Sequence, residues 1–151
     1  MTSETYALGM KVRREMLGDE YVDNALNSAD EFTRPFQDLA VEYCFGKIWA
    51  RDDLPRKTRS LVNVGMLVAL NRAHELEVHI GMALRNGCTK AEIREVLLQA
   101  TVYCGMPAGS QSFGAVAVAG AAGPLPIFCM ELANRVAAEA ISRIRLSESA
   151  D

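Results

Sequence analysis

The chain has two histidines, and both lie in the stretch from Asn71 to His79, five residues apart. Histidine changes its charge near neutral pH, so this clustering favours a site for proton chemistry. On a helix through this stretch, Glu75 and His79 are four residues apart and share one face, with Asn71 one turn earlier on the same stripe. His74 lies near the expected helix start, where free N–H groups and the positive end of the dipole attract carboxylates. We therefore take His74, Glu75 and His79 as the candidate catalytic residues.

The same spacing is also typical of a solvated helix face that carries an ordinary Glu–His pair, and this interpretation stays open. A zinc site is disfavoured. The histidines of this H-E-x-x-x-H sequence turn to different faces of a helix, whereas those of the zinc motif H-E-x-x-H share one face. We therefore predict no metal at this stretch.

A second polar cluster runs from Arg51 to Ser60 and contains four cations in nine residues. Such a cluster is most often a solvated helix start, but arginine also binds carboxylates through two parallel hydrogen bonds. Arg59 and Ser60 begin an apolar segment, so they are the members expected to point inward. From the residues alone, the prediction is a helical domain with a His/Glu/Arg constellation suited to an anionic substrate.

Composition and charge exclude several classes of protein. Half of the 151 residues are hydrophobic, and the formal net charge of −3 comes without a basic run, which argues against nucleic-acid binding. No apolar stretch reaches the roughly 18 to 20 uncharged residues of a membrane span, and the N-terminus lacks the pattern of a signal peptide. We therefore expect a cytoplasmic protein. Its four cysteines lie far apart without a C-x-x-C pair, and we expect them to be free thiols.

Helical periodicity extends almost from end to end, and no stretch alternates as a strand. The fold class predicted is all-α, a compact bundle of about six to eight helices. Thr33 and Asp53 are expected N-caps, each with a proline two residues later, and Thr89 to Glu92 reads as a capping box. The expected helices are 4–17, 19–27, one from Thr33 to near Trp49, one from Asp53 to Leu70, 73–86, 90–103, one from Pro107, and 127–146. Residues 1–123 are expected to form the main domain, with 124–151 a diverged C-terminal helix and tail that pack on it.

Six motifs follow one another in the region 6–113. They are Asp30-Glu31-Phe32-Thr33-Arg34-Pro35, Glu42-Tyr43-Cys44-Phe45-Gly46, Arg56-Lys57-Thr58-Arg59-Ser60-Leu61, Ala69-Leu70-Asn71-Arg72-Ala73-His74-Glu75, Ala83-Leu84-Arg85-Asn86-Gly87 and Glu92-Ile93-Arg94-Glu95-Val96-Leu97-Leu98-Gln99. In this number, order and spacing they resemble the carboxymuconolactone decarboxylase family. The resemblance implies an all-α, alkylhydroperoxidase D-like fold in a homo-oligomer, a trimer or hexamer. It also implies cofactor-free decarboxylation of 4-carboxymuconolactone to the β-ketoadipate enol-lactone in protocatechuate catabolism.

The implied reaction assigns roles to the candidate residues. Loss of CO2 leaves a carbanion that spreads into the unsaturated lactone, so the substrate is its own electron sink and no cofactor is required. The protein must anchor a carboxylate, stabilise the charged lactone oxygen and supply a proton to carbon. Our hypothesis is that Arg59 and Arg72 anchor the substrate, that His74 donates to the oxyanion, and that His79 is the proton donor. Three further residues complete the site: Glu75 holds His79, and Ser60 and Asn71 join the substrate-binding set.

Two departures from the family pattern bear on the site. The family usually has proline where this chain has Ala73, which is a mild change at a helix start. It often has arginine where Gly81 stands, which removes a possible contact to an anion.

Two other functions are weighed against the decarboxylase. Alkylhydroperoxidase D-like disulfide reductases of the same superfamily need a C-x-x-C pair before their histidine. If His79 is aligned with that histidine, Arg72 and Glu75 stand where the cysteines would be, so this chemistry is disfavoured. A non-catalytic, oligomeric binding protein is the other alternative, and the diverged C-terminal segment keeps it open.

Overall fold

Every element of the computed structural model, which describes residues 3–121, is a helix. The all-α prediction is therefore confirmed over this part of the chain, and the predicted segment 124–151, with its helix 127–146, lies outside it. The elements are α1 (Glu4–Leu17), α2 (Asp19–Asn27), α3 (Arg34–Leu39), the π-helix η1 (Ala40–Trp49), α4 (Arg56–Ala69), α5 (Ala73–Arg85), α6 (Lys90–Cys104) and α7 (Met106–Ala121). None of them is long and apolar enough to cross a membrane.

Local sequence signals place most helix ends correctly. The first two helices have the predicted bounds, and the capping box is confirmed: Thr89 Oγ1 accepts from the Glu92 amide at 3.1 Å while Glu92 Oε2 accepts from the Thr89 amide at 2.8 Å. Of the two other predicted N-caps, one is correct in position and one is wrong. Thr33 is the N-cap residue of α3, but its side chain bonds back to Asp30 and makes no capping hydrogen bond. Asp53 lies ahead of α4, whose N-cap is Pro55, and its carboxylate is bound to Arg51. In both cases a nearer polar partner takes the capping oxygen.

The expected third helix is also divided. After α3 the chain continues as η1, a ten-residue π-helix. A π-helix offsets successive residues differently from an α-helix, so the apolar face of residues 40–49 could not be assigned from a period of 3.6. The helix buries Val41, Phe45 and Trp49 against α1.

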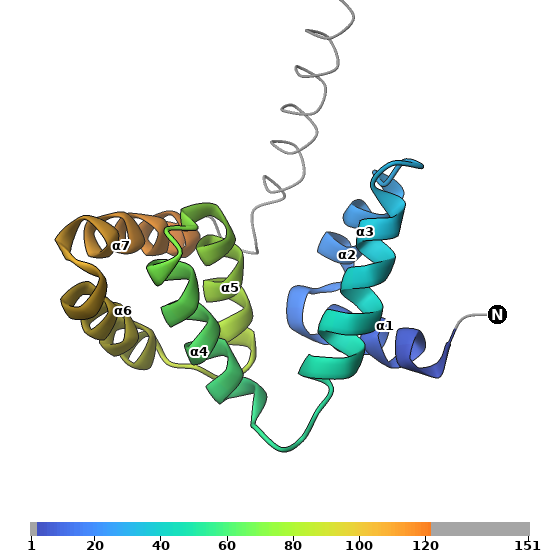
Figure 1. The fold of residues 1–151 in the computed structure, drawn as a ribbon, viewed down its shortest axis with the longest axis horizontal. Helices are drawn as coiled ribbons and strands as arrows, with labels where there is room; N and C mark the ends of the chain where they lie inside the picture. Colours follow the sequence, from blue (N-terminus) through green and yellow to red (C-terminus); the bar gives the residue numbers. More distant parts are fainter. Residues whose placement is uncertain (1–2, 122–151) are drawn as a thin grey trace, which may run out of the picture.

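The helices form two groups joined by residues 50–55, as Figure 1 shows. Helices α4 to α7 enclose one apolar cluster, and α1, α2 and η1 contribute to a second. Helix α5 belongs to both, because Leu76 and Ile80 lie in the first cluster while Val78 and Met82 lie in the second. A helix with apolar residues on two sides is buried between two layers, and here α5 holds the groups together.

Two polar contacts reinforce this junction. Arg85 Nη1 donates to the Leu17 carbonyl oxygen at 2.6 Å, at the end of α1. Arg56, in the first turn of α4, pairs with Glu15 at 2.7 Å. Both contacts join residues more than forty positions apart in sequence, so they fix the tertiary arrangement and not a local turn.

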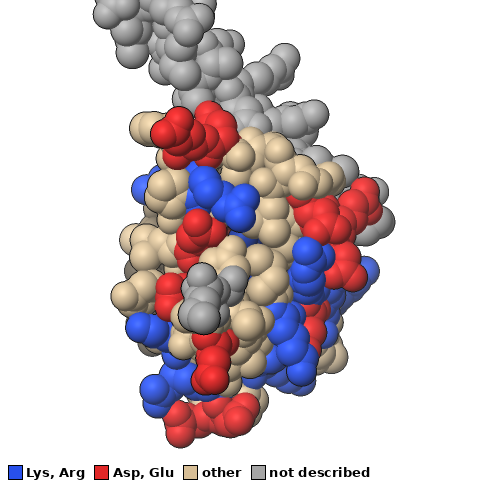
Figure 2. Space-filling view, turned by 90° about the vertical axis from the view of Figure 1, so that its right-hand side faces the viewer, with Lys and Arg blue, Asp and Glu red and all other residues tan. Residues whose placement is uncertain are grey.

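The N-terminal group contains a buried cation. Arg13 is almost fully buried, donates from Nη2 to Gln37 Oε1 at 2.7 Å, and lies over the Phe45 ring at 5.7 Å from its centroid. Burial lowers the pKa of its guanidinium. Outside this core, the face that these helices present carries acidic and basic side chains interspersed, as Figure 2 shows.

Helices α1 and η1 approach closely because each has a glycine at the place where it contacts the backbone of the other. A Cβ atom on Gly9 would collide with the Val41 carbonyl oxygen and lie 2.9 Å from the Gly46 nitrogen. A Cβ atom on Gly46 would in turn collide with the Thr5 carbonyl oxygen. Backbone atoms cannot move aside without shifting a whole helix, so both positions require glycine.

This contact gives a stability prediction. We expect Gly9→Ala to lower the free energy of unfolding by about 2 kcal/mol or more, since overpacking a tight contact typically costs ~1–3 kcal/mol. The matched control is Gly114→Ala on α7, where an added Cβ meets nothing within 4 Å. There the better helix propensity of alanine should raise stability by about 0.5–1 kcal/mol. Urea denaturation of the two variants measures the difference, and equal effects would contradict the α1–η1 packing.

Candidate active site

The candidate residues lie on the antiparallel hairpin of α4 and α5. Two contacts set its register: Asn63 faces His79, and Asn86 Nδ2 donates to Ser60 Oγ at 3.0 Å. Asn71 makes the turn with a positive φ of 57°. The Arg72 amide bonds to the Leu67 carbonyl at 2.9 Å and the Asn71 amide to the Val68 carbonyl at 3.0 Å. This is a Schellman turn with asparagine in the position that glycine usually occupies.

His79 is mostly buried between the two helices. Its Nδ1 lies 3.3 Å from Nδ2 of Asn63, on the facing helix α4. Burial lowers the pKa of the imidazole below its ordinary value, because an apolar environment disfavours the charged form, and the negative charge of Glu75 partly opposes this. The predicted Glu75–His79 pair therefore exists as an electrostatic interaction, while the hydrogen bond of the ring goes to Asn63.

Arg59 lies one turn before Asn63 on the same stripe of α4. Its Nε donates to the Leu54 carbonyl oxygen at 3.2 Å, and it forms no ion pair within residues 3–121. The other three cations of the cluster are all neutralised: Arg51 by Asp53, Arg56 by Glu15, and Lys57 by Glu92 at 2.7 Å. Of these four cations, Arg59 is the one whose charge remains available to an anionic ligand.

His74 points elsewhere. It is four residues before Val78 and so shares the side of α5 that packs against the N-terminal group. Its Nε2 is buried and has no hydrogen-bond partner. The two histidines thus do not converge, and no group of three metal-binding side chains occurs among the residues that the structure describes.

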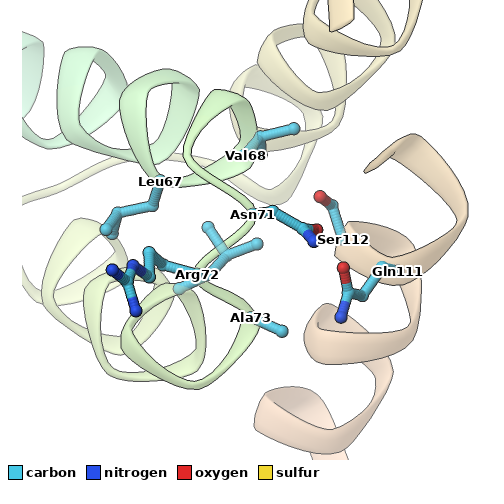
Figure 3. A pocket seen from close by; sticks show the side chains of 8 residues that line it. Leu67, Val68, Asn71, Arg72, Ala73, Gln111 and Ser112 are labelled. Carbon is cyan, nitrogen blue, oxygen red and sulfur yellow. The ribbon is translucent and has the colours of Figure 1, made fainter. Parts of the chain in front are cut away.

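The remaining predicted residues occupy separate places. Ser60 is only 1% exposed, and its hydroxyl donates to the Arg56 carbonyl oxygen at 3.0 Å while accepting from Asn86, so both of its hydrogen-bonding functions are used inside the fold. Asn71 turns its amide toward Gln111 and Ser112 of α7, whereas the Arg72 side chain extends in the opposite direction (Figure 3).

Asn71, Arg72, Gln111 and Ser112 line a small pocket at the hairpin turn. Its empty space is about 140 Å³ including its open mouth, and Leu67, Val68, Ala73 and Leu76 form its apolar walls. Away from this pocket, Asn63 and His79 meet between α4 and α5, with Arg59 one turn before Asn63 on α4 and Glu75 one turn before His79 on α5.

Sequence reasoning missed Asn63. Its only local signal is its position four residues after Arg59, which places it on the same face of α4. Asn63 matters to the site only because His79 of α5 lies opposite it, so the sequence of α4 alone could not identify it as a site residue.

Residues 34–118 match the carboxymuconolactone decarboxylase family. The chain belongs to this family. It is 48% identical over 99 residues to the nitrosuccinic acid decarboxylase npaB of Metarhizium robertsii, a match that covers 66% of this chain and 69% of the relative. It is 38% identical over 107 residues to the 4-carboxymuconolactone decarboxylase of Acinetobacter baylyi, covering 71% and 80%. The comparisons therefore support a carboxy-lyase, and they do not select one substrate.

The environment of His79 makes its titration a direct test of its burial. A neutral imidazole whose folded-state pKa is lowered adds stability above the unfolded pKa near 6.5. That contribution is lost as pH falls from there toward the folded pKa. We expect NMR titration to place the pKa of His79 below 6.5. We also expect His79→Gln to flatten the decline of stability over that pH window, with His74→Gln as the control. A pKa at or above 6.5 would contradict the burial of His79.

Proposed function

We propose that this chain catalyses the cofactor-free decarboxylation of 4-carboxymuconolactone to the β-ketoadipate enol-lactone. The observation that carries the proposal is the contact between Asn63 on α4 and His79 on α5, with Arg59 one turn before Asn63. Arg59 forms no ion pair within residues 3–121, and the imidazole of His79 is mostly buried. A substrate with two carboxylates suits this arrangement, because one can be anchored while the other is lost.

The reaction requires the protein mainly to bind the substrate and to stabilise the charge that develops on it. The bond to the departing carboxylate breaks, CO2 leaves, and the electron pair moves through the unsaturated lactone to its carbonyl oxygen. Arg59 fixes the remaining carboxylate, and a polar N–H near the lactone oxygen stabilises the developing charge. The carbon then takes up a proton. The reaction thus requires one anchoring cation, one N–H donor and a proton from solvent.

The structure gives less support to a role in the site for the other predicted residues. Arg72 is exposed and forms no ion pair within residues 3–121, and its role as a second anchor stays a prediction. His74 would need to expose its buried Nε2 before it could donate to an oxyanion. Asn71 and Ser60 support the hairpin through their turn geometry and buried hydroxyl, and their contacts to substrate remain a prediction.

Nitrosuccinate is the second candidate substrate, and a specific observation favours it: the relative named for it has the higher identity, 48% against 38%. The physical requirements are the same. Loss of the carboxylate beside the nitro group sends the electron pair onto the nitro oxygens, and protonation at carbon gives 3-nitropropanoate. The second carboxylate is the anchor for Arg59 in this case too.

An assay with both substrates tests the proposal. We expect the purified chain to release CO2 from 4-carboxymuconolactone without added metal or cofactor. We expect His79→Ala to lower kcat on the order of 10²-fold while folding stays intact. Arg94→Ala, which removes an exposed arginine paired with Glu95, is the control and should keep full activity. Faster turnover of 2-nitrosuccinate would reassign the substrate, and no CO2 from either compound would contradict the decarboxylase.

We also propose that the chain assembles as a homo-oligomer, a trimer or hexamer. Four large apolar side chains are strongly exposed near one end of the bundle: Leu70 (67%), Val102 (81%), Tyr103 (80%) and Met106 (73%). Helices α4 and α6 run in the same direction, with Lys57 beside Cys88 and Gly65 beside Val96. Leu70 therefore lies level with the end of α6. Large apolar side chains that are exposed together at one end of a bundle are typical of a protein interface.

Charge in this patch should weaken the assembly. We expect the double variant Val102→Lys, Tyr103→Lys to shift the mass in solution toward the monomer, because two desolvated charges would oppose each other across the interface. Analytical ultracentrifugation measures the change, and Lys90→Glu, at the other end of α6, serves as the control. A monomeric unmodified chain would contradict the proposed oligomer.

A further inference from the structure

The amide of Asn63 is the hydrogen-bond partner of His79 among the residues described. Asn63 comes from α4 and His79 from α5, sixteen residues apart, and the contact joins Nδ2 of the amide to Nδ1 of the ring at 3.3 Å. An amide nitrogen can only donate, so Nδ1 is the acceptor in this contact. A neutral ring with an accepting Nδ1 carries its single proton on Nε2.

We propose that Asn63 is a positioning residue that keeps the proton of a neutral His79 on Nε2, which makes this N–H a hydrogen-bond donor to the oxygen that gains charge as CO2 leaves. The proposal rests on the decarboxylation proposed above. It replaces the role of proton donor that the sequence suggested for His79.

Three observations support a neutral donor. Burial favours the uncharged imidazole. Nε2 of His79 makes no hydrogen bond within residues 3–121, and unlike Nε2 of His74 it is not among the fully buried atoms that lack a partner there, so its N–H is not used inside the fold. Glu75, which would favour an imidazolium, acts on His79 through space and not through a hydrogen bond to the ring.

The electron and proton balance is consistent with this role. The bond to the carboxylate breaks and its electron pair ends on the lactone oxygen, or on the nitro oxygens of nitrosuccinate. The Nε2–H of His79 hydrogen-bonds to that oxygen and stays on the ring, because a neutral imidazole that gave up its proton would become a strongly basic imidazolate. The carbon is protonated by water. Neutral imidazoles are known to serve as donors of this kind in buried sites.

NMR of protein labelled with 15N-histidine tests the tautomer directly, since the chain has only two histidines and His74→Gln assigns the signals. Near pH 7, without substrate, we expect His79 to show a protonated Nε2 and an unprotonated Nδ1. In Asn63→Asp the carboxylate can only accept, so Nδ1 should become protonated. Asn24→Asp, an exposed asparagine on α2, is the matched control and should leave the spectrum unchanged. A protonated Nδ1 in the unmodified protein would overturn the proposal.

Kinetics provide the second readout. Asn63→Leu keeps the side-chain size but removes the donor, and we expect kcat to fall about 10-fold with KM changed less than about 3-fold, because the lost interaction acts in the transition state. An unchanged kcat would overturn the positioning role. If the unmodified chain shows the expected spectrum but turns over neither substrate, the decarboxylation fails while the tautomer assignment stands.

Discussion

The structure depends on the burial of α5 on two sides. Its residues 76, 80 and 83 complete the cluster of α4, α6 and α7, while Val78 and Met82 complete the cluster of α1, α2 and η1. A helix that is apolar on two faces is not stable at a surface, because both faces must be covered. In this fold, each helical group covers one apolar face of α5. The ion pair of Arg56 with Glu15 and the hydrogen bond of Arg85 to Leu17 then fix how the groups meet.

This double burial determines where chemistry can occur. Between the two apolar faces of α5 runs a narrow stripe with Glu75 and His79, and the antiparallel α4 lays Asn63 and Arg59 beside it. Burial between the helices lowers the pKa of the imidazole, and the contact with Asn63 gives the ring a polar partner, which avoids the cost of an unsatisfied group. The result is a partly buried polar contact between α4 and α5, with the unpaired Arg59 one turn away on α4, in surroundings where electrostatic interactions are stronger than in water.

Such an arrangement of a cation and a partly buried imidazole suits reactions in which the substrate accepts its own electrons. Neither an unsaturated lactone nor a nitro group requires the protein to provide an electron sink, so an anchor for one carboxylate and a donor to one oxygen are the main needs. The family therefore accommodates substrates as different as 4-carboxymuconolactone and nitrosuccinate in relatives of this chain.

The sequence by itself determined the helices, because periodicity, the Thr89–Glu92 capping box and the glycine after α5 act within a few residues of chain. It also located the Asn71–His79 stretch and excluded a C-x-x-C redox site. Only the tertiary structure decided which of four neighbouring cations stays free, which histidine is enclosed, and that Asn63 holds the other. Those outcomes depend on partners such as Glu15 and Glu92, which lie tens of residues away from the groups they neutralise. Local sequence patterns cannot predict such pairings, because the pairings form only when packing brings the helices together.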